Sequence, residues 1–345
     1  MARICTQRRR IKPFGVIFIM KNETLITLCG SNYGETYIPA TCNIENCKVV
    51  NLFARGSQKS QQVSKKFSIP LYKNFEEAIS ESNLAILATN DDVNTKLSKA
   101  LFDSKVPFIL EHPIKTHNLE SIISLSNKHK IPFLLNTHFT STVPIKKFIA
   151  SFENISKYSE VQLIEVSANS RTLFSTLDII EKLVGLDDIS VISTTNLGDN
   201  HLNHVLNISG KNVVLNLQTW QNELDDSSDC IVGHSIRVNF NTGNLLLANS
   251  FGPIVWAPIY STNYPADYTI HELFEDKNKK LDVANYRVDA NKDIITQLIE
   301  SNFDECKAYY ERYLKVSRAW EALLPTHTKT LQSKDIDHRI WKISK

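Results

Sequence analysis

The chain has 345 residues, 42% of them apolar, and a chain of this length can bury the cores of two domains rather than one. Its formal net charge is +2, so no general affinity for nucleic acid or for a membrane surface is implied. The cysteines show neither C-x-x-C spacing nor a cluster with histidine, which argues against a zinc site and against a disulfide framework. Reduced thiols and no bound metal are what we expect of a cytoplasmic protein. The six cysteines are Cys5, Cys29, Cys42, Cys47, Cys230 and Cys306.

Residues 1–19 form an unusual start to the chain. Arg8, Arg9 and Arg10 precede an apolar run over residues 16–20 that is too short for the apolar region of a signal peptide. We therefore expect residues 1–19 to be an N-terminal extension that is disordered or loosely attached. No window of the sequence approaches the length of a transmembrane helix.

Residues 20–138 alternate between continuous apolar runs and amphipathic stretches. Apolar strands separated by helices are typical of a parallel sheet covered on both faces, so we predict an N-terminal α/β domain with a doubly wound Rossmann sheet. The expected strands are residues 25–29, 48–53, 70–72, 84–88, 107–110 and 132–135. The expected helices are a stretch directly after residue 34 and residues 57–67, 74–80, 93–103 and 119–129.

Residues 139–345 follow a different pattern. Short strands succeed one another with tight turns between them, which predicts hairpins and hence a C-terminal α+β domain with a mostly antiparallel open sheet. The expected strands are residues 160–168, 191–194, 204–208, 212–217, 235–240, 245–248 and 254–259. The expected helices are residues 144–152, 175–184, 292–302 and 305–323.

The first candidate site is the turn after the first predicted strand. Gly30, Ser31, Asn32, Tyr33 and Gly34 lead from that strand into a helical pattern. The start of such a helix offers free N–H groups and a positive dipole end to a pyrophosphate. Asn32 stands where the usual G-x-G-x-x-G fingerprint has its second glycine. For this loop taken alone, an ordinary glycine-rich connection is the alternative interpretation.

The turn after the second strand indicates which cofactor is bound. No acidic residue stands there, where an NAD-specific site would hold the ribose 2′-hydroxyl. Two cations, Arg55 and Lys59, and two hydroxyls, of Ser57 and Ser60, surround a tight turn at Gly56 instead. A 2′-phosphate needs donors and positive charge, and arginine can bind it through two hydrogen bonds, so the sequence favours NADPH. A basic surface loop is the alternative.

Two further segments end neighbouring strands of the same predicted sheet. Thr89 follows the strand at residues 84–88, and Glu111, His112 and Pro113 follow the strand at residues 107–110. Ligands of such sheets bind outside the carboxyl ends of the strands. We therefore assign Thr89, Glu111 and His112 to the cofactor site and place His112 beside the expected nicotinamide.

In these features the chain resembles the glucose-fructose oxidoreductase and inositol dehydrogenase (Gfo/Idh/MocA) superfamily and, within it, the thiazolinyl imide reductases. The resemblance spans roughly residues 24–325 and is more specific in the first half of the chain. It rests on the segments at residues 30–37, 54–57 with Ser60, 69–72, 111–113, 136–137, 175–178 and 252–256.

Two departures from the wider superfamily carry chemical meaning. Its sugar and inositol dehydrogenases usually have lysine where this chain has His112, and histidine where it has Ser175, three residues before Asp178. An alcohol oxidation needs a base for the hydroxyl proton, and both customary candidates are replaced. The resemblance therefore implies reduction of a C=N bond, in which hydride goes to carbon and a general acid protonates nitrogen.

Histidine is suited to that acid because its intrinsic pKa lies near neutrality. His112 and His138 follow neighbouring strands and are the two histidine candidates, each with a partly buried polar role as the alternative. Asp178 either polarises a histidine or donates when protonated, with a solvated helix carboxylate as the alternative. Related imide reductases tend to have an aromatic hydroxyl near the position of Phe139, which leaves the identity of the acid open. Glu111 is assigned to anchoring its turn or orienting His112.

The resemblance also implies a substrate and partners. Tyr33, Ser175 and Trp256 are assigned to the substrate, with core packing as the alternative for Trp256. The expected reaction is NADPH-dependent reduction of a thiazoline to a thiazolidine on a carrier-protein-bound intermediate of a nonribosomal peptide synthetase, in siderophore-type biosynthesis. An uncovered sheet face favours a homodimer. The alternatives are an NADP-dependent sugar or cyclitol dehydrogenase with His112 as base, and a non-catalytic NADPH-binding regulator or scaffold.

Overall fold

The computed structural model describes residues 23–198, 200–222, 233–259, 270–274, 283–324 and 329–331. The expectation for residues 1–19 lies outside these ranges. Within them, no helix combines the length and the apolar character that a membrane crossing requires.

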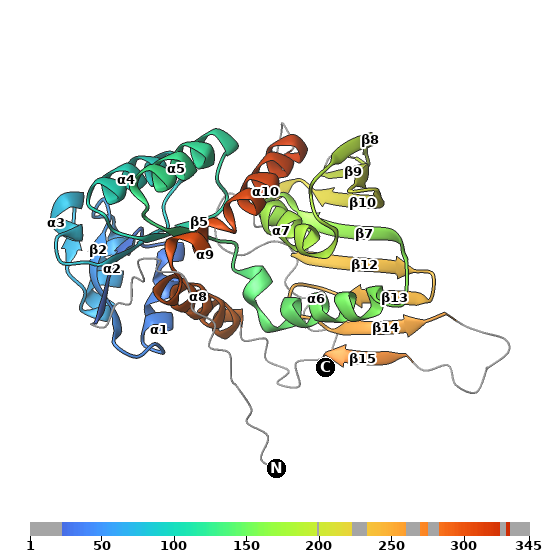
Figure 1. Cartoon of the computed structure of the whole chain (residues 1–345), viewed down its shortest axis with the longest axis horizontal. Helices are drawn as coiled ribbons and strands as arrows, with labels where there is room; N and C mark the ends of the chain where they lie inside the picture. Colours follow the sequence, from blue (N-terminus) through green and yellow to red (C-terminus); the bar gives the residue numbers. More distant parts are fainter. Residues whose placement is uncertain are drawn as a thin grey trace, which may run out of the picture.

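The first sheet has six parallel strands in the order β3-β2-β1-β4-β5-β6 (Figure 1). This arrangement confirms the predicted doubly wound parallel sheet. Along β4, Leu84 and Ile86 face one apolar cluster and Ala85 and Leu87 face the other, because successive side chains point to opposite faces of a strand. The strands are β1 (Thr24–Cys29), β2 (Cys47–Phe53), β3 (Leu71–Tyr72), β4 (Leu84–Leu87), β5 (Phe108–Glu111) and β6 (Phe133–Asn136).

Helices cover both faces of this sheet. One face packs against the apolar sides of α4 and α5, and the other against α1 and α2. The turn after β1 continues as a short 3₁₀ helix, η1 (Tyr33–Thr36), before α1 begins. The helices are α1 (Tyr37–Thr41), α2 (Gln58–Phe67), α3 (Phe75–Ile79), α4 (Asp91–Asp103) and α5 (Thr116–His129).

The second sheet has eight strands in the order β15-β14-β13-β12-β7-β10-β9-β8. All neighbours are antiparallel except β7 and β10, so the prediction of a mostly antiparallel sheet is confirmed. The strands β8, β9 and β10 form an antiparallel run. Its last strand, β10, lies beside β7 on the side opposite β12 and has the same direction as β7. The strands are β7 (Val161–Asn169), β8 (Ile189–Asn196), β9 (His201–Ile208), β10 (Lys211–Gln218), β12 (His234–Phe240), β13 (Gly243–Leu247), β14 (Ile254–Pro258) and β15 (His271–Phe274).

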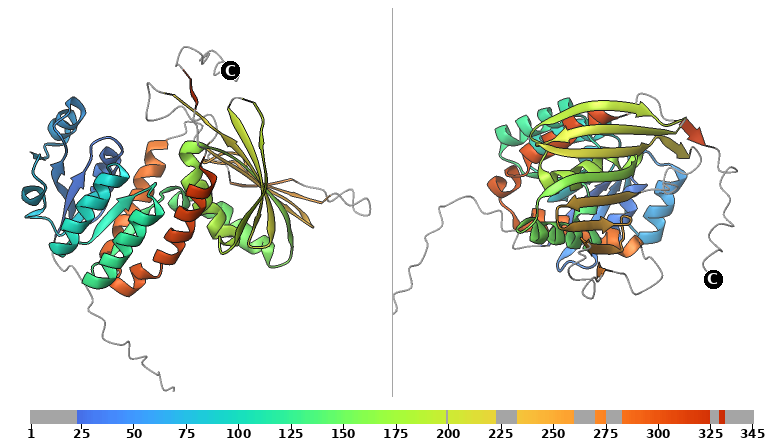
Figure 2. Two further views of the ribbon diagram at one scale, coloured as in Figure 1. Left: turned by 90° about the horizontal axis from the view of Figure 1, so that it is seen from above. Right: turned by 90° about the vertical axis from the view of Figure 1, so that its right-hand side faces the viewer.

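Helices α6 (Val143–Ser156) and α7 (Leu173–Val184) cover one face of the second sheet. No helix of the described chain covers the opposite face, which looks toward the viewer in the right-hand panel of Figure 2. A small separate sheet pairs β11 (Trp220–Asn222) with β16 (Lys329–Leu331).

The C-terminal helices tie the two halves together. The sequence-based division at residue 138 places them with the second half, yet α8 (Val283–Glu300) packs on α1 and on the first sheet. The helix predicted over residues 305–323 is two helices, α9 (Phe303–Lys307) and α10 (Tyr310–Leu323), and α10 packs between α5 and α7 (Figure 1). One apolar cluster therefore runs from the first sheet through α10 and α7 to the second sheet.

Candidate functional site

The loop after β1 passes so close to the end of β4 that glycine is required at its first position. Gly30 has φ +99°, and a Cβ there would lie 2.3 Å from the carbonyl oxygen of Ala88 and 3.2 Å from Cγ2 of Thr89. At Gly34 a Cβ would lie 3.1 Å from Leu28. The helical stretch predicted after residue 34 consists of the 3₁₀ helix η1 and the five residues of α1. The loop thus brings together Gly30, Gly34 and Thr89, as a phosphate-binding turn requires.

The Thr89 backbone is fixed by α4. Asn94 accepts the Thr89 N–H at 3.2 Å and donates to the Thr89 carbonyl at 3.1 Å, while the Thr89 hydroxyl also donates to Asn94 Oδ1. The turn that closes β4 beside Gly30 is therefore rigid.

The second turn forms around Gly56, which has φ +86°. Arg55 is exposed and has no ion-pair partner among the described residues. Lys73, which the sequence analysis missed, approaches the same turn, since a Cβ on Gly56 would lie 2.8 Å from Lys73 Cε and 3.4 Å from its Nζ. Ser57 caps α2 by accepting the Ser60 N–H. Two cations and one exposed hydroxyl therefore surround Gly56.

Two expectations for this turn need correction. Lys59, counted among its cations, forms an ion pair with Glu35 of η1, and Lys66 pairs with the same carboxylate at 2.8 Å. The Ser60 hydroxyl is buried and donates to the carbonyl of Ser57 at 2.8 Å. Ser60 therefore shapes the turn, and the free charge beside Arg55 comes from Lys73.

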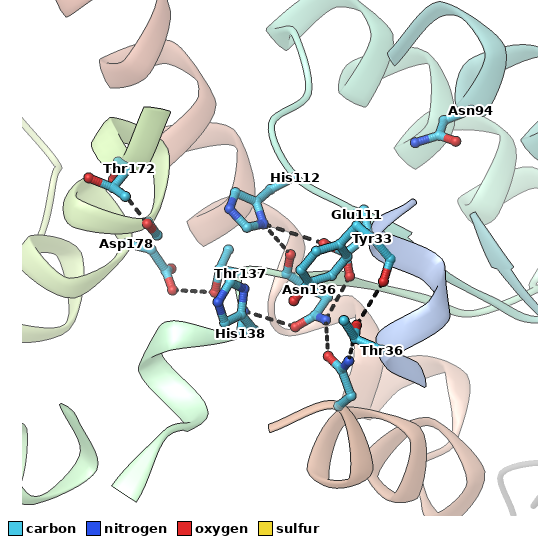
Figure 3. Close-up of polar contacts among 12 residues, drawn as sticks. Tyr33, Thr36, Asn94, Glu111, His112, Asn136, Thr137, His138, Thr172 and Asp178 are labelled. Atoms are coloured by element: carbon cyan, nitrogen blue, oxygen red, sulfur yellow. Dashed lines mark hydrogen bonds and ion pairs between the residues drawn. The ribbon is translucent and has the colours of Figure 1, made fainter. Parts of the chain in front are cut away.

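At the ends of β5 and β6, a buried hydrogen-bond network surrounds Glu111 and Asn136 (Figure 3). Tyr37 donates to Glu111 Oε1, and Asn136 Nδ2 lies 2.8 Å from the same oxygen. Asn136 Nδ2 also lies 3.0 Å from Oδ1 of Asn291 on α8, and Asn291 donates to the Thr36 hydroxyl at 3.0 Å. The network fixes α8 against both strand ends and against η1.

His112 is oriented by this network. Its Nδ1 lies 2.7 Å from the carbonyl oxygen of Asn136 and 3.7 Å from Oε2 of Glu111. A carbonyl can only accept, so Nδ1 carries a hydrogen and Nε2 is the nitrogen without a partner among the described residues. The side chain is 12% exposed and packs on Phe174 at a ring distance of 5.5 Å. Glu111 lies beside His112, and its role in anchoring the turn or orienting His112 stays a prediction.

His138 is buried in an unusual state. Its φ of +32° is rare for a residue with a side chain, and neither ring nitrogen has a hydrogen-bond partner in the described chain. Its ring lies 5.7 Å from Tyr33 and 5.8 Å from His112. Burial, with contributions from His112, Arg287 and His234, holds the pKa of His138 well below its ordinary value. The ring is therefore neutral at physiological pH.

Asp178 is fully buried and its carboxylate is occupied. Arg312 of α10 pairs with Oδ1, and the hydroxyls of Thr137 and Thr140 donate to Oδ2 at 2.6 and 3.0 Å. One charged partner and two hydroxyl donors therefore occupy both carboxyl oxygens. Asp178 is therefore not the solvated helix carboxylate of the alternative interpretation, and its catalytic role stays a prediction.

Two residues assigned to the substrate lie in packed surroundings. Ser175 is 1% exposed and bonds to Nε2 of His234 at 2.9 Å, while Ser250 bonds to Nδ1 at 2.8 Å. Burial and the neighbouring His112 lower the pKa of His234 to about 3. Trp256 pairs with Leu245 in the sheet and packs against Phe240 at 6.0 Å. Of the three substrate residues expected, the structure brings Tyr33 alone beside the two site histidines.

Comparison with protein-family models gives one match for each half of the chain. A model described as the oxidoreductase family with an NAD-binding Rossmann fold, the Gfo/Idh/MocA family, matches residues 25–136. A model described as thiazolinyl imine reductase Irp3-like, C-terminal, matches residues 159–257. Comparison with curated proteins gives no match.

Solved structures share the fold of both halves at low sequence identity. An oxidoreductase from Agrobacterium radiobacter in complex with NAD+, L-tartaric acid and magnesium is 14% identical with a TM-score of 0.67, over 87% of this chain and 95% of that chain. A dehydrogenase from Chromobacterium violaceum is 13% identical with a TM-score of 0.68, over 87% and 94%. The 3-ketoreductase KijD10 from Actinomadura kijaniata, in complex with TDP-benzene and NADP, is 11% identical with a TM-score of 0.64, over 90% and 99%.

Proposed function

This chain belongs to the Gfo/Idh/MocA oxidoreductase family and carries an Irp3-like C-terminal domain, and we propose that it is an NADPH-dependent reductase of a thiazoline C=N bond. The product is a thiazolidine. The observation that carries the proposal is the combination of the C-terminal family match with His112 at the end of β5, a position where the sugar dehydrogenases of the superfamily usually have lysine.

The residues around the two glycine turns fit a dinucleotide with a 2′-phosphate. Gly30 leaves room for backbone beside Ala88, and the loop through Gly34 supplies N–H groups for a diphosphate. Arg55, Ser57 and Lys73 offer two positive charges and a hydroxyl around Gly56, which suit a phosphate. When bound there, reduced nicotinamide supplies the hydride for the imine carbon.

His112 provides the proton in this proposal. Its Nδ1–H is engaged by the Asn136 carbonyl, so Nε2 is the atom available to protonate the imine nitrogen. Glu111 lies 3.7 Å from Nδ1 and stabilises the imidazolium from which that proton leaves. Tyr37 and Asn136 hold the Glu111 carboxylate in place. His138 is neutral and neither of its ring nitrogens has a hydrogen-bond partner among the described residues, so in this proposal it positions a ligand rather than transferring a proton.

The proposed substrate is an intermediate tethered to a carrier protein of a nonribosomal peptide assembly line, in siderophore-type synthesis. Family similarity supports this substrate. We also propose that the enzyme is a cytoplasmic homodimer that associates through the uncovered face of the second sheet, since such a face is rarely left in water.

The test is mass spectrometry of a carrier-bound thiazoline after incubation with the enzyme and NADPH deuterated at the transferred position. We expect one deuterium and one solvent hydrogen to be added to the ring, with consumption of NADPH. Formation of NADPH from NADP and a polyol, without thiazoline reduction, would instead establish the dehydrogenase alternative. Cofactor binding without turnover of either substrate would establish the regulator alternative.

A further inference from the structure

Three side chains near His112 have buried polar atoms without a hydrogen-bond partner among the described residues. They are the hydroxyl of Tyr33, both ring nitrogens of His138 and Nε of Arg287. Buried polar groups in native proteins are almost always hydrogen-bonded, so several orphaned groups in one place indicate a ligand site.

These groups converge from three separate elements. Tyr33 belongs to η1, His138 precedes the 3₁₀ helix η2 (Phe139–Ser141), and Arg287 lies on α8, which contacts both η1 and η2. The rings of Tyr33 and His138 are 5.7 Å apart. Arg287 precedes Asn291 by one helical turn, so the Asn291 bonds to Asn136 and Thr36 place Arg287 on the same side of α8.

The electrostatics of the cluster agree with this placement. The charge of Arg287 contributes, after burial, to the low pKa of His138. Burial and the Glu111 charge raise the pKa of Tyr33, so the phenol keeps its proton. The cluster therefore combines one cation, a phenolic O–H and a neutral imidazole. The carboxylate of Glu111, whose charge acts on Tyr33, is bonded to Tyr37 and Asn136.

This set of groups suits an oxygen acceptor that carries full or partial negative charge. Arginine donates through a planar fork, and a phenol and a neutral imidazole each add one donor. We infer that Arg287, Tyr33 and His138 bind the acyl oxygen of the substrate, next to the C=N bond that is reduced. This inference rests on the proposed function, because a thiazoline formed from cysteine carries its acyl carbon on the ring carbon next to nitrogen.

The acyl group of the substrate fits this position better than the cofactor phosphates do. The proposed donors to the phosphates are backbone N–H groups of the loop between Gly30 and Gly34, at the start of η1. The His138 ring lies 5.7 Å from that of Tyr33 and 5.8 Å from that of His112, which is the proposed proton donor to the ring nitrogen (Figure 3). An acyl oxygen near His138 therefore orients the adjacent nitrogen toward His112.

The test compares two probes in Arg287→Ala and in wild type, each with bound NADP+. The probes are 2-methyl-2-thiazoline-4-carboxylate and 2-methyl-2-thiazoline, which lacks the acyl group, and their affinities are measured by calorimetry. Loss of a charge-assisted hydrogen bond is expected to weaken the carboxylate probe about tenfold or more, with little change for the neutral probe. Affinity for NADPH alone, followed by fluorescence, is expected to stay within about twofold.

Two further variants make the result specific. Arg287→Lys keeps the charge without the fork and is expected to recover part of the affinity. Lys292→Ala removes a charge from the same helix at a position roughly 140° around its axis, and is expected to leave both probes unchanged. Equal affinity of Arg287→Ala and wild type for the carboxylate probe would overturn the inference, and so would a loss confined to NADPH.

The outcomes separate this inference from the proposed reaction. Suppose that the wild type reduces the carrier-bound thiazoline, and that Arg287→Ala keeps the wild-type KM and the wild-type affinity for the carboxylate probe. This result refutes the acyl site and leaves the proposed reaction standing. Suppose instead that the wild type binds the carboxylate probe more tightly than Arg287→Ala does, but reduces no thiazoline. This result supports the acyl site and refutes the proposed reaction.

Discussion

At the scale of single residues, the hydrogen bond from Nδ1 of His112 to the Asn136 carbonyl decides which ring nitrogen faces the site. If Nε2 protonates the imine, His112→Ala is expected to lower kcat by about 10² to 10⁴, the usual contribution of a general acid. NADPH affinity is expected to change little, because the phosphate turns are untouched. Steady-state kinetics and a fluorescence titration measure the two effects.

His112→Asn is the matched control for this prediction. An amide keeps a hydrogen-bond donor of similar reach but cannot transfer a proton. Loss of turnover in both variants supports proton transfer. Near-normal turnover in His112→Asn, with loss in His112→Ala, would make His112 a positioning residue, and full activity in both would remove it from the chemistry.

Cofactor choice is a second property of individual residues. With Arg55 and Lys73 beside Gly56, the protein is expected to bind 2′,5′-ADP more tightly than 5′-AMP, and NADPH more tightly than NADH. Arg55→Asp and Lys73→Ala are each expected to reduce that preference by roughly tenfold. Calorimetric titration of each ligand measures it.

Lys59→Ala provides the internal control for cofactor choice. Lys59 is only four positions from Arg55 in the sequence, but it pairs with Glu35. Its removal is therefore expected to leave the ratio of 2′,5′-ADP to 5′-AMP affinity unchanged. Equal affinity of the wild type for the two nucleotides would end the assignment of a 2′-phosphate site.

At the scale of elements, the buried pair of Asp178 and Arg312 joins α7 to α10. Removing one partner leaves the other charge buried and unpaired, so Asp178→Asn and Arg312→Gln are each expected to lower the free energy of unfolding by roughly 3 kcal/mol. The double variant is expected to lose less than the sum of the two, because it leaves no orphaned charge. Urea denaturation of all four proteins measures this coupling.

A comparison with Lys315 shows whether the buried pair is special. Lys315 lies on the same helix and pairs with the exposed carboxylate of Asp187, so Lys315→Ala is expected to change stability little. Additive effects of the Asp178 and Arg312 variants would contradict a structural pair. Normal stability of Asp178→Asn with a large loss of turnover would restore Asp178 as a proton donor.

Most elements could be predicted from the sequence because the burial of each one is visible in the apolar pattern of its own residues. Strands β4, β5 and β6 are buried along their whole length and read as continuous apolar runs. The start of α8 could not be predicted, because Arg287 and Asn291 face a polar network instead of an apolar core. The capping box of Asn302 and Glu305 marks the start of α9, where the sequence already predicted a boundary between two helices.

The parts of the candidate site that could be predicted are those whose residues lie together in one short segment of the sequence. The glycine loop and the Glu111-His112 turn each lie within a few residues of a strand end. Lys73 and Arg287 contribute from distant segments, and no local pattern places them beside Gly56 or His138. Ser175 was assigned to the substrate by analogy of position, but His234 from β12 fills the space beside it.

At the scale of the whole molecule, two buried histidines make stability depend on pH. The pKa of His234 is lowered to about 3 and that of His138 is also lowered, so both are neutral in the folded protein. The unfolded chain binds a proton at each near its ordinary pKa of about 6.5, so stability falls as the pH drops below that value. Each histidine is expected to contribute a slope of about 1.4 kcal/mol per pH unit between about pH 6.5 and 5.

Urea denaturation across that range tests the pH dependence. His234→Gln is expected to remove about half of the slope that the two histidines contribute. His117→Gln, at an exposed position, is expected to leave it unchanged. An unfolding free energy in wild type that does not depend on pH over this window would show that neither histidine is held neutral.

The uncovered face of the second sheet leads to the last prediction. A row of paired residues crosses it from Val205 and Val214 through the Glu165–Arg237 ion pair to Leu246. Apolar residues on both sides of an ion pair suit a partner surface of the same composition, and a twofold axis through the row would bring equal patches together. We expect sedimentation equilibrium to show a dimer at micromolar concentration.

Val205→Asp with Val214→Asp is the informative variant. These valines are cross-strand neighbours, and two carboxylates beside Glu165 would face their own copies across a twofold axis, so dissociation to monomers is expected with the fold retained. Val143→Asp is the matched control, because Val143 is 43% exposed at the start of α6, on the opposite side of the sheet, where a carboxylate suits the helix dipole. A monomeric wild type would remove the interface, and a double variant that remains dimeric would place it elsewhere.

The strands of this face also position His234 and the residues around it. A monomeric variant with unchanged turnover would therefore show that dimerisation does not shape the site.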